Sequence, residues 1–282
     1  MLNSKLQTLG TPNFQLMLPD YHIHTPLCNH ATGDPEEYRG AAGKMGIPQI
    51  CFTDHAPNPD GYDPAHRMTL GDFPSYREMI EALRGGRSPE VLMGVEVDYY
   101  EGCERFMAKW LPAQDFDFVI GSVHFIEGWG FDNPEERHIW DSSDITATWR
   151  KYFKLMLRFV ASGLFDAVGH LDLPKKFGHR PREKDLKEMV RPVLDLIAEN
   201  GMGVELNTSG LRKPVKEIYP SPLILSMALE RNIPICFGSD AHSPEDVGKS
   251  FASALELARD AGYTEYFRIR QRQKELTPLP GV

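Results

Sequence analysis

The sequence predicts an α/β fold, a single-domain, distorted (β/α)7 barrel of the TIM type. Short apolar runs typical of buried strands alternate seven times with longer segments of helical periodicity, which indicates a parallel sheet covered by helices. A potential metal or catalytic ligand lies at the end of each apolar run, and parallel barrels hold their active sites at this end of the strands. We therefore expect a metal site at the C-terminal rim.

The expected strands cover residues 20–24, 47–53, 91–97, 116–123, 165–171, 203–207 and 233–238. In the first strand, extended geometry places His22 and His24 on one face, roughly 6.6 Å apart at about 3.3 Å per residue. Tyr21 and Ile23 should then share the opposite, apolar face. Two imidazoles on one face can reach the same metal ion.

The expected helices cover residues 35–45, 74–83, 102–110, 143–162, 183–200, 222–232 and 244–261, and a short polar tail follows the last one. The first helix has clear end signals, because Asp34 can cap its N-terminus and Gly46 can end it. Long loops at residues 57–72, 125–140 and 173–182 can approach the rim.

Composition favours one acidic domain. The chain has 282 residues, of which 41% are hydrophobic, and no linker or repeat divides it. We expect residues 1–18 to be an N-terminal extension and residues 19–282 the catalytic barrel. The net charge of −9 argues against a nucleic-acid polymer or an anionic membrane as partner.

The four cysteines form no closely spaced pair, and no signal peptide or long apolar run is present, which predicts a reduced, cytoplasmic protein. The oligomeric state stays open.

The candidate metal ligands are His22, His24, His30, His55, Glu96, His124, His170, Asp240 and His242. Seven imidazoles and two carboxylates exceed the ligand set of one zinc ion, so we expect two or three ions with a bridging carboxylate. Mixed imidazole and carboxylate ligands favour Zn, Fe or Mn over Mg or Ca. Asp20, Asp54 and Asp172 lie beside proposed ligands and could orient imidazoles, although Asp54 would equally suit a loop-capping role.

The ordered motifs D-Y-H-I-H-T, T-D-H, G-V-E, S-V-H, G-H-L-D and S-D-A-H resemble those of the polymerase and histidinol phosphatase (PHP) family over about residues 19–260. The segment E-L-N-T-S-G-L-R-K, residues 205–213, resembles the histidinol-phosphatase branch. The resemblance implies a trinuclear centre. Its ions would be held by His22, His24, Glu96 and Asp240; by Glu96, His124 and His170; and by His30, His55 and His242.

The resemblance also implies a phosphomonoesterase of histidine biosynthesis that converts L-histidinol phosphate to L-histidinol and phosphate. A metal-held hydroxide would attack phosphorus beside the bridging Glu96, and Asp240 and His242 are the candidates for protonating the leaving oxygen. Two alternatives stay open. One is a PHP-fold phosphoesterase for nucleotides or other small monoesters. The other is an amidohydrolase that cleaves C–N bonds, which commonly carries a bridging lysine at the end of strand four, where this chain has His124.

A phosphate dianion needs local cations in an acidic protein. The candidates in the late loops are Lys175, Lys176, Arg180, Arg182, Arg212 and Lys213. Arg212 is the first choice, because a guanidinium can grip two phosphate oxygens, and Lys176 and Asn207 are further candidates. We expect Arg180, Arg182 and Lys213 to be solvated. Side chains that could enclose the organic half of the substrate are Phe125, Trp129, Phe131, Glu135, Trp140 and Phe177.

Overall fold

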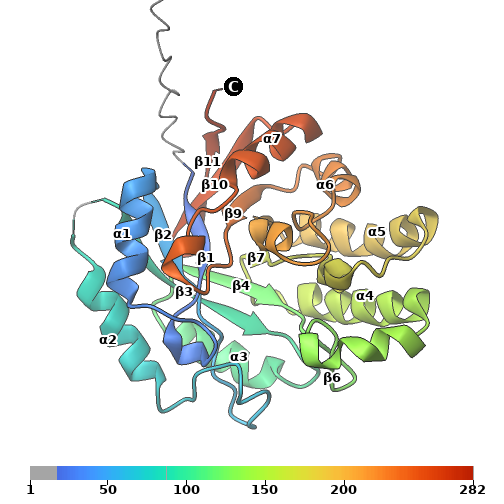
Figure 1. The fold of residues 1–282 in the computed structure, drawn as a ribbon, viewed down its shortest axis with the longest axis horizontal. Coiled ribbons are helices and arrows are strands. Elements are labelled where there is room, and N and C mark those ends of the chain that lie inside the picture. Colours follow the sequence, from blue (N-terminus) through green and yellow to red (C-terminus); the bar gives the residue numbers. More distant parts are fainter. Residues whose placement is uncertain (1–17, 87, 282) are drawn as a thin grey trace, which may run out of the picture.

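The computed structural model describes residues 18–86 and 88–281, so the expected extension lies outside the described residues except for Leu18. Its centre is a parallel sheet in the order β1-β2-β3-β4-β7-β8-β9 (Figure 1). These strands are β1 (Asp20–Ile23), β2 (Gln49–Phe52), β3 (Glu90–Asp98), β4 (Phe118–Ser122), β7 (Ala167–Val168), β8 (Gly203–Asn207) and β9 (Ile235–Gly238). A parallel bridge between Ile23 and Ala241 brings the two ends of the sheet together. The predicted seven-stranded barrel is confirmed.

Seven α-helices surround the strands in the described part of the chain (Figure 1). They are α1 (Pro35–Met45), α2 (Phe73–Leu83), α3 (Glu104–Trp110), α4 (Ile145–Ala161), α5 (Glu183–Glu199), α6 (Pro222–Leu229) and α7 (Phe251–Ala261). Helix α1 begins and ends as predicted. Asp34 accepts a hydrogen bond from the Glu36 amide at 2.8 Å, Glu37 accepts one from the Asp34 amide at 2.7 Å, and Gly46 ends the helix at φ 72°. None of the helices described is long and apolar enough to cross a membrane.

Short 3-10 helices occupy the loops between these elements. They are η1 (Pro26–Cys28), η2 (Leu111–Ala113), η3 (Pro134–Ser142), η4 (Leu173–Phe177), η5 (Thr208–Arg212) and η6 (Pro244–Asp246). The expected loop 125–140 contains part of η3 and a small hairpin, β5 (Phe125–Ile126) and β6 (Trp129–Gly130). The expected helix 244–261 is divided into η6 and α7, because Gly248 and Ser250 adopt left-handed φ values of 62° and 65°.

Strand β1 departs from regular alternation. Asp20 lies opposite Ile50, whereas Ile23 lies opposite Phe52, so the pairing register shifts along the strand. Ile23 joins the cluster between sheet and helices, while Tyr21 packs with other strand side chains inside the barrel. The prediction that Tyr21 and Ile23 share a face is therefore wrong.

The C-terminal segment is a β-hairpin rather than a polar tail. Strands β10 (Glu265–Arg270) and β11 (Gln273–Pro278) are antiparallel. Phe267 and Ile269 are buried in the same cluster as Tyr21, and the Ile269 amide donates a hydrogen bond to the Tyr21 hydroxyl at 3.1 Å. The hairpin therefore fills the N-terminal end of the barrel, opposite the expected site.

The contact between this hairpin and β8 can be tested by Gly203→Ala. A Cβ at Gly203 would lie closer to the buried Phe267 ring than van der Waals contact allows. We expect the free energy of unfolding to fall by about 1–3 kcal/mol because of overpacking. Gly40→Ala is the matched control, since nothing lies within 4 Å of that Cβ in α1 and alanine favours the helix. Urea unfolding should give a lower midpoint than wild type for Gly203→Ala and a higher one for Gly40→Ala. Equal midpoints for the two variants would contradict the proposed contact.

Candidate active site

The nine candidate ligands converge at the C-terminal end of the strands, around the carboxylate of Glu96. This side chain is 1% exposed, and a bridge between His55 and Glu96 extends the pairing of β2 with β3. Five imidazoles surround its two oxygens, with nitrogens of His170 at 3.1 Å, His55 at 3.2 Å, His22 at 3.3 Å, His24 at 3.6 Å and His124 at 3.8 Å. Glu96 therefore lies where a bridging ligand would be needed.

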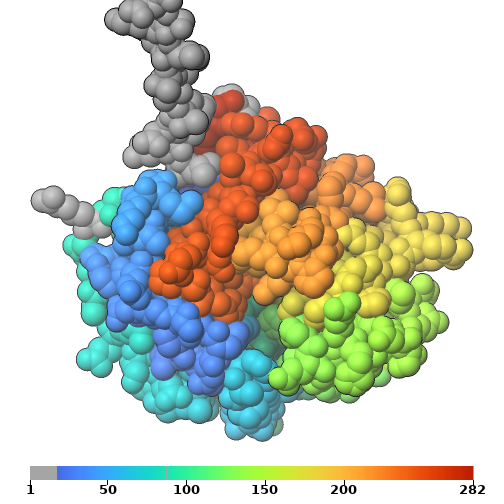
Figure 2. All heavy atoms as spheres, viewed as in Figure 1, coloured from blue at the N-terminus to red at the C-terminus, as the bar shows by residue number. Residues whose placement is uncertain are grey.

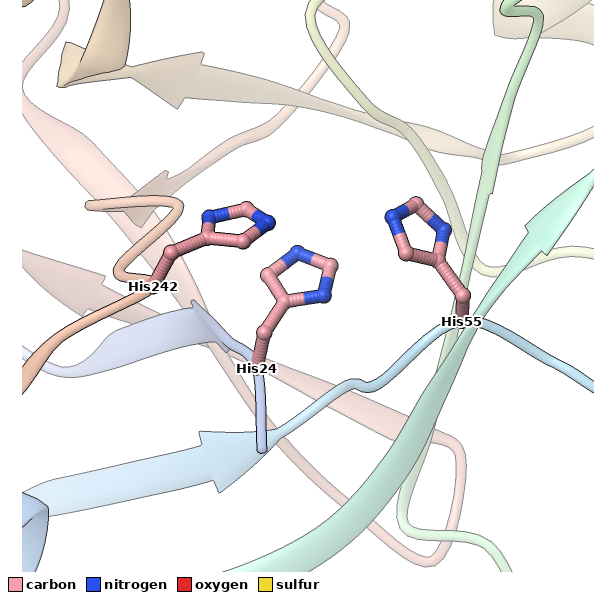
Figure 3. A group of neighbouring side chains, drawn as sticks. All are labelled: His24, His55 and His242. Carbon is pink, nitrogen blue, oxygen red and sulfur yellow. The ribbon is translucent and has the colours of Figure 1, made fainter. Parts of the chain in front are cut away.

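Asp240 forms a second centre beside Glu96. Its Oδ1 lies 3.4 Å from His24 Nε2, 3.4 Å from His242 Nδ1 and 4.0 Å from His22 Nε2. The rings of His24 and His242 are stacked, with centroids 4.0 Å apart, and the His55 ring lies on the other side of His24 with its centroid 4.6 Å away (Figure 3). One ligand atom from each of these three histidines lies within 4.8 Å of the others.

In four of the histidines, one ring nitrogen is paired with an oxygen acceptor from another residue. The acceptors are Glu205 for His22 at 2.6 Å, Asp98 for His124, the Cys28 carbonyl for His30 at 2.8 Å and the Asp240 carbonyl for His242 at 3.1 Å. Metal-binding histidines usually carry such an acceptor, which fixes the tautomer and leaves the other nitrogen free for the ion.

The donor set fits bound cations. His30 Nδ1 and His242 Nδ1 each face a carbonyl, which can only accept, so both nitrogens must carry hydrogen. In the neutral rings the two Nε2 lone pairs then face each other at 2.9 Å, an arrangement that a shared cation relieves. The separations of 3.3–4.0 Å around His22 and His24 also fit, because ligands about 2.1 Å from a tetrahedral ion lie roughly 3.4 Å apart.

Unpartnered nitrogens support the same interpretation. Within the described residues, five buried imidazole nitrogens have no hydrogen-bond partner. They are His22 Nε2, His24 Nδ1, His24 Nε2, His55 Nδ1 and His170 Nδ1. Buried polar atoms usually have a partner, so an unpartnered group of this kind indicates a ligand-binding position.

The pKa values of the site histidines shift in opposite directions, depending on whether carboxylates or other histidines lie nearby. Burial lowers the pKa of His22, but the carboxylates of Glu205 and Glu96 outweigh it and raise this pKa well above its ordinary value. Burial, and then the neighbouring His24, lower the pKa of both His30 and His242. The carboxylate side of the site thus favours positive charge, which protons or bound cations can supply.

Glu205 on β8 is a site residue that we did not predict. Its Oε1 holds His22, and its Oε2 accepts hydrogen bonds from the His170 amide at 3.0 Å and the Asn207 side chain at 3.1 Å. Gly238 makes room for it, since a Cβ there would collide with the Glu205 carboxylate. A buried glutamate in the middle of an apolar strand was the available signal.

Replacing Glu205 by glutamine tests this role. A glutamine NH2 facing His22 Nδ1 can only donate, which favours a proton on Nε2, the nitrogen that faces Glu96. We expect metal affinity to fall about 10- to 100-fold. Competition with a chromogenic chelator measures this, and the exposed Glu199→Gln is the control. Unchanged affinity would contradict the role of Glu205.

A second unpredicted group orients His124. Asp98, at the end of β3, accepts a hydrogen bond from His124 and also pairs with the buried Arg67. Arg67 donates a further bond to Asp63 at 2.9 Å, and Asp63 holds His66 at 2.8 Å. The loop 57–72 is thereby anchored to the site.

The three aspartates expected to orient imidazoles differ in their contacts. Asp54 lies 3.6 Å from His24 Nδ1 and also accepts hydrogen bonds from Thr25. Asp20 bonds to Ser239 and to the backbone, and Asp172 bonds to the Ser221 amide and pairs with Lys175. Among the described residues neither Asp20 nor Asp172 contacts an imidazole, so the prediction is wrong for these two.

A cavity of about 390 Å³ opens above the ligands. The residues that line it come from segments far apart in the chain, and blue, green and orange parts of the chain lie next to one another on the face that Figure 2 shows. Its cationic lining residues are Arg212, Lys213 and Lys176. Lys213, which we expected to be solvated, is partly exposed and lines the cavity, and burial lowers the pKa of its amine.

The other basic residues of these loops do not line the cavity. Lys175 is 1% exposed and its amine is bonded to Glu217, Asp172 and the Ile218 carbonyl. Arg180 pairs with Glu217 and Arg182 with Asp185, away from the ligands. Their positions agree with the expectation for Arg180 and Arg182.

Asn207 is fully buried and does not line the cavity. Its amide NH2 donates to Glu205 at 3.1 Å and to Asp240 at 3.4 Å, and its oxygen accepts the Ser209 amide at 2.9 Å. Both ends of the side chain are therefore bonded to protein among the described residues, and no free donor is left for the phosphate contact that we expected of Asn207. It orients two carboxylates instead.

The aromatic lining is smaller than expected. Of the six residues expected to enclose the organic half of a substrate, Phe125 lines the cavity. Trp140 and Phe131 are buried in the core, where the Trp140 indole donates to the Phe131 carbonyl at 2.7 Å. Hydrophobic packing of the loop accounts for these two side chains.

Family models match most of the chain. A model described as "PHP domain" matches residues 20–209, and a model described as "PHP-associated" matches residues 223–256. The first covers all of the candidate ligands except Asp240 and His242.

Full-length relatives have related names. "Probable histidinol-phosphatase" of Deinococcus radiodurans is 46% identical over 260 residues, which cover 91% of this chain and 98% of that protein. "Histidinol-phosphatase" of Bacillus subtilis is 32% identical over 264 residues, which cover 84% and 98%. A crystal structure of histidinol phosphate phosphatase from Lactococcus lactis, complexed with zinc, L-histidinol and phosphate, has a TM-score of 0.77 and covers 92% of this chain and 99% of that one. At 21% identity it supports the fold alone.

Proposed function

The chain belongs to the PHP domain family, and from this premise we propose that it is a metal-dependent phosphomonoesterase that hydrolyses L-histidinol phosphate to L-histidinol and phosphate. The observation that carries the proposal is the presence of cationic side chains in the same cavity that the histidine and carboxylate cluster lines. Arg212 and Lys176 line the same cavity as Glu96 and Asp240. A monoester can thus meet cationic donors and the cluster at once.

We assign two or three transition-metal ions, Zn, Fe or Mn, to the nine ligands. Glu96 would bridge ions held by His22, His24 and Asp240 on one side and by His124 and His170 on the other, and His30, His55 and His242 would hold a third. Such ions lower the pKa of bound water and neutralise phosphoryl oxygens, so no serine or cysteine nucleophile is needed.

Residues of the chain supply binding and orientation. Arg212 is anchored by bonds to the Ser239 carbonyl at 2.7 Å and the Asp240 carbonyl at 3.2 Å, and its Nε lies 3.2 Å from Asp246. Its Nη1 is buried without a partner among the residues described, which suits a phosphate oxygen. We assign delivery of the proton to the leaving oxygen to Asp240 and His242, which both line the cavity.

A substrate panel tests the proposal. We expect kcat/KM for L-histidinol phosphate to exceed that for p-nitrophenyl phosphate at least about 100-fold, roughly 2.7 kcal/mol of transition-state binding. Elemental analysis of the same preparation should find two to three metal ions per chain. Equal rates on the two esters, or a preference for a nucleotide, would contradict the substrate assignment, and a metal-free active protein would contradict the mechanism.

A further inference from the structure

We propose that Tyr219 is a substrate-binding residue whose hydroxyl donates a hydrogen bond to a phosphoryl oxygen of the bound monoester. The inference rests on the proposed phosphatase function and adds a residue that the sequence motifs did not indicate. Tyr219 lies between η5 and α6 and lines the cavity together with Arg212 and Lys213.

The hydroxyl of Tyr219 lacks a partner. The residue is 0% exposed, and no group in residues 18–86 or 88–281 forms a hydrogen bond with its oxygen. Leaving a buried hydroxyl unpaired costs free energy, and phenylalanine would fill the same space without that cost. A phosphate dianion offers only acceptors to a neutral phenol, so the substrate supplies the partner that the protein lacks.

The position of the Tyr219 ring is fixed on several sides. Its backbone forms two hydrogen bonds with Asn207, at 2.7 and 3.0 Å, which tie the loop to the end of β8. The Lys175 amine lies 5.0 Å from the ring centroid, and the His170 ring lies edge-on at 6.3 Å. Gly210 permits the approach, because a Cβ there would lie 2.8 Å from Tyr219 Cε2. A ring held in this way presents its hydroxyl without an ordering cost at the moment of binding.

Tyr152 provides a matched control. It is also 0% exposed, but its hydroxyl donates to the Leu171 carbonyl at 3.1 Å and it does not line the cavity. Both Tyr219→Phe and Tyr152→Phe remove a buried hydroxyl. The hydroxyl of Tyr152 has a hydrogen-bond partner in the protein, whereas that of Tyr219 has none among the described residues.

The experiment measures inorganic phosphate affinity by calorimetry, steady-state kinetics on L-histidinol phosphate and p-nitrophenyl phosphate, and thermal unfolding, all on metal-loaded protein. For Tyr219→Phe we expect a Kd for phosphate about 10- to 100-fold higher, a similar loss of kcat/KM on both esters, and no decrease in Tm without phosphate. For Tyr152→Phe we expect a lower Tm and a phosphate Kd within about twofold of wild type.

A Tyr219→Phe variant that binds phosphate within about twofold of wild type would overturn the proposal, as would one that loses affinity only to the extent that Tyr152→Phe does. The outcome is separable from the substrate assignment. If wild type does not prefer L-histidinol phosphate but Tyr219→Phe still weakens phosphate binding, the substrate assignment fails and the role of Tyr219 stands. If the wild-type protein neither binds phosphate nor hydrolyses the esters, both the substrate assignment and the role of Tyr219 are contradicted.

Discussion

Replacing Glu96 by alanine is expected to lower kcat/KM at least about 1000-fold, which corresponds to ~4 kcal/mol of transition-state stabilisation. The physical reason is its central position, with five imidazoles within 4 Å of its carboxylate and almost no exposure to solvent. Without this negative charge, two neighbouring cations would face each other with less compensation. Elemental analysis should find at least one metal ion fewer per chain.

Two controls separate this effect from damage to the fold. Glu96→Gln keeps the shape of the side chain but removes its charge, so it should lose metal nearly as completely as the alanine variant. Glu90→Gln changes a partly buried glutamate at the opposite end of the same strand and should keep its metal. A Glu96→Ala protein with the metal content and kcat/KM of wild type would contradict the bridging role.

Replacing Arg212 by alanine is expected to lower kcat/KM about 100- to 1000-fold on both L-histidinol phosphate and p-nitrophenyl phosphate, the range seen when one preorganised donor to a transition-state oxyanion is lost. The two esters share only the phosphoryl group, so an equal loss on both locates the contact at the phosphate. Arg212→Lys retains a charge but not the planar pair of donors, and it should recover part of the activity. The exposed Arg182→Ala is the control for loss of a cation. A loss confined to one ester would contradict the assignment.

The alternation of strands and helices could be predicted because its signals are local. The predicted N-cap at Asp34 and helix end at Gly46 are signals within one helix, and the structure has both. Pairing across strands is different, because the register shift in β1 depends on contacts with β2. The C-terminal hairpin was missed because Gln271 and Arg272 form its turn at φ 46° and 59° without the usual asparagine or glycine.

The candidate ligands could be selected from the sequence because, in a parallel barrel, the end of each strand identifies the rim. The residues that orient these ligands could not be selected in the same way. The sequence alone does not tell which face of β8 carries Glu205 or that Arg67 reaches Asp98 from a distant loop. The sequence also does not tell which of the lysine and arginine side chains in the late loops are buried. Lys175 and Lys176 are neighbours, yet one is bonded within the core and the other lines the cavity.

The closure of the barrel has a mechanical consequence. Between the first and last strands the ring is joined by an isolated bridge at Ile23 and Ala241, with hydrogen bonds of 2.9 and 3.2 Å. His24 lies on one side of this seam and Asp240 on the other, 3.4 Å apart. A cation held by both residues would link the first and last strands of the barrel across this bridge. Release of the ion and separation of the two strands would then be thermodynamically linked, so metal binding at the catalytic centre would also stabilise the closed barrel.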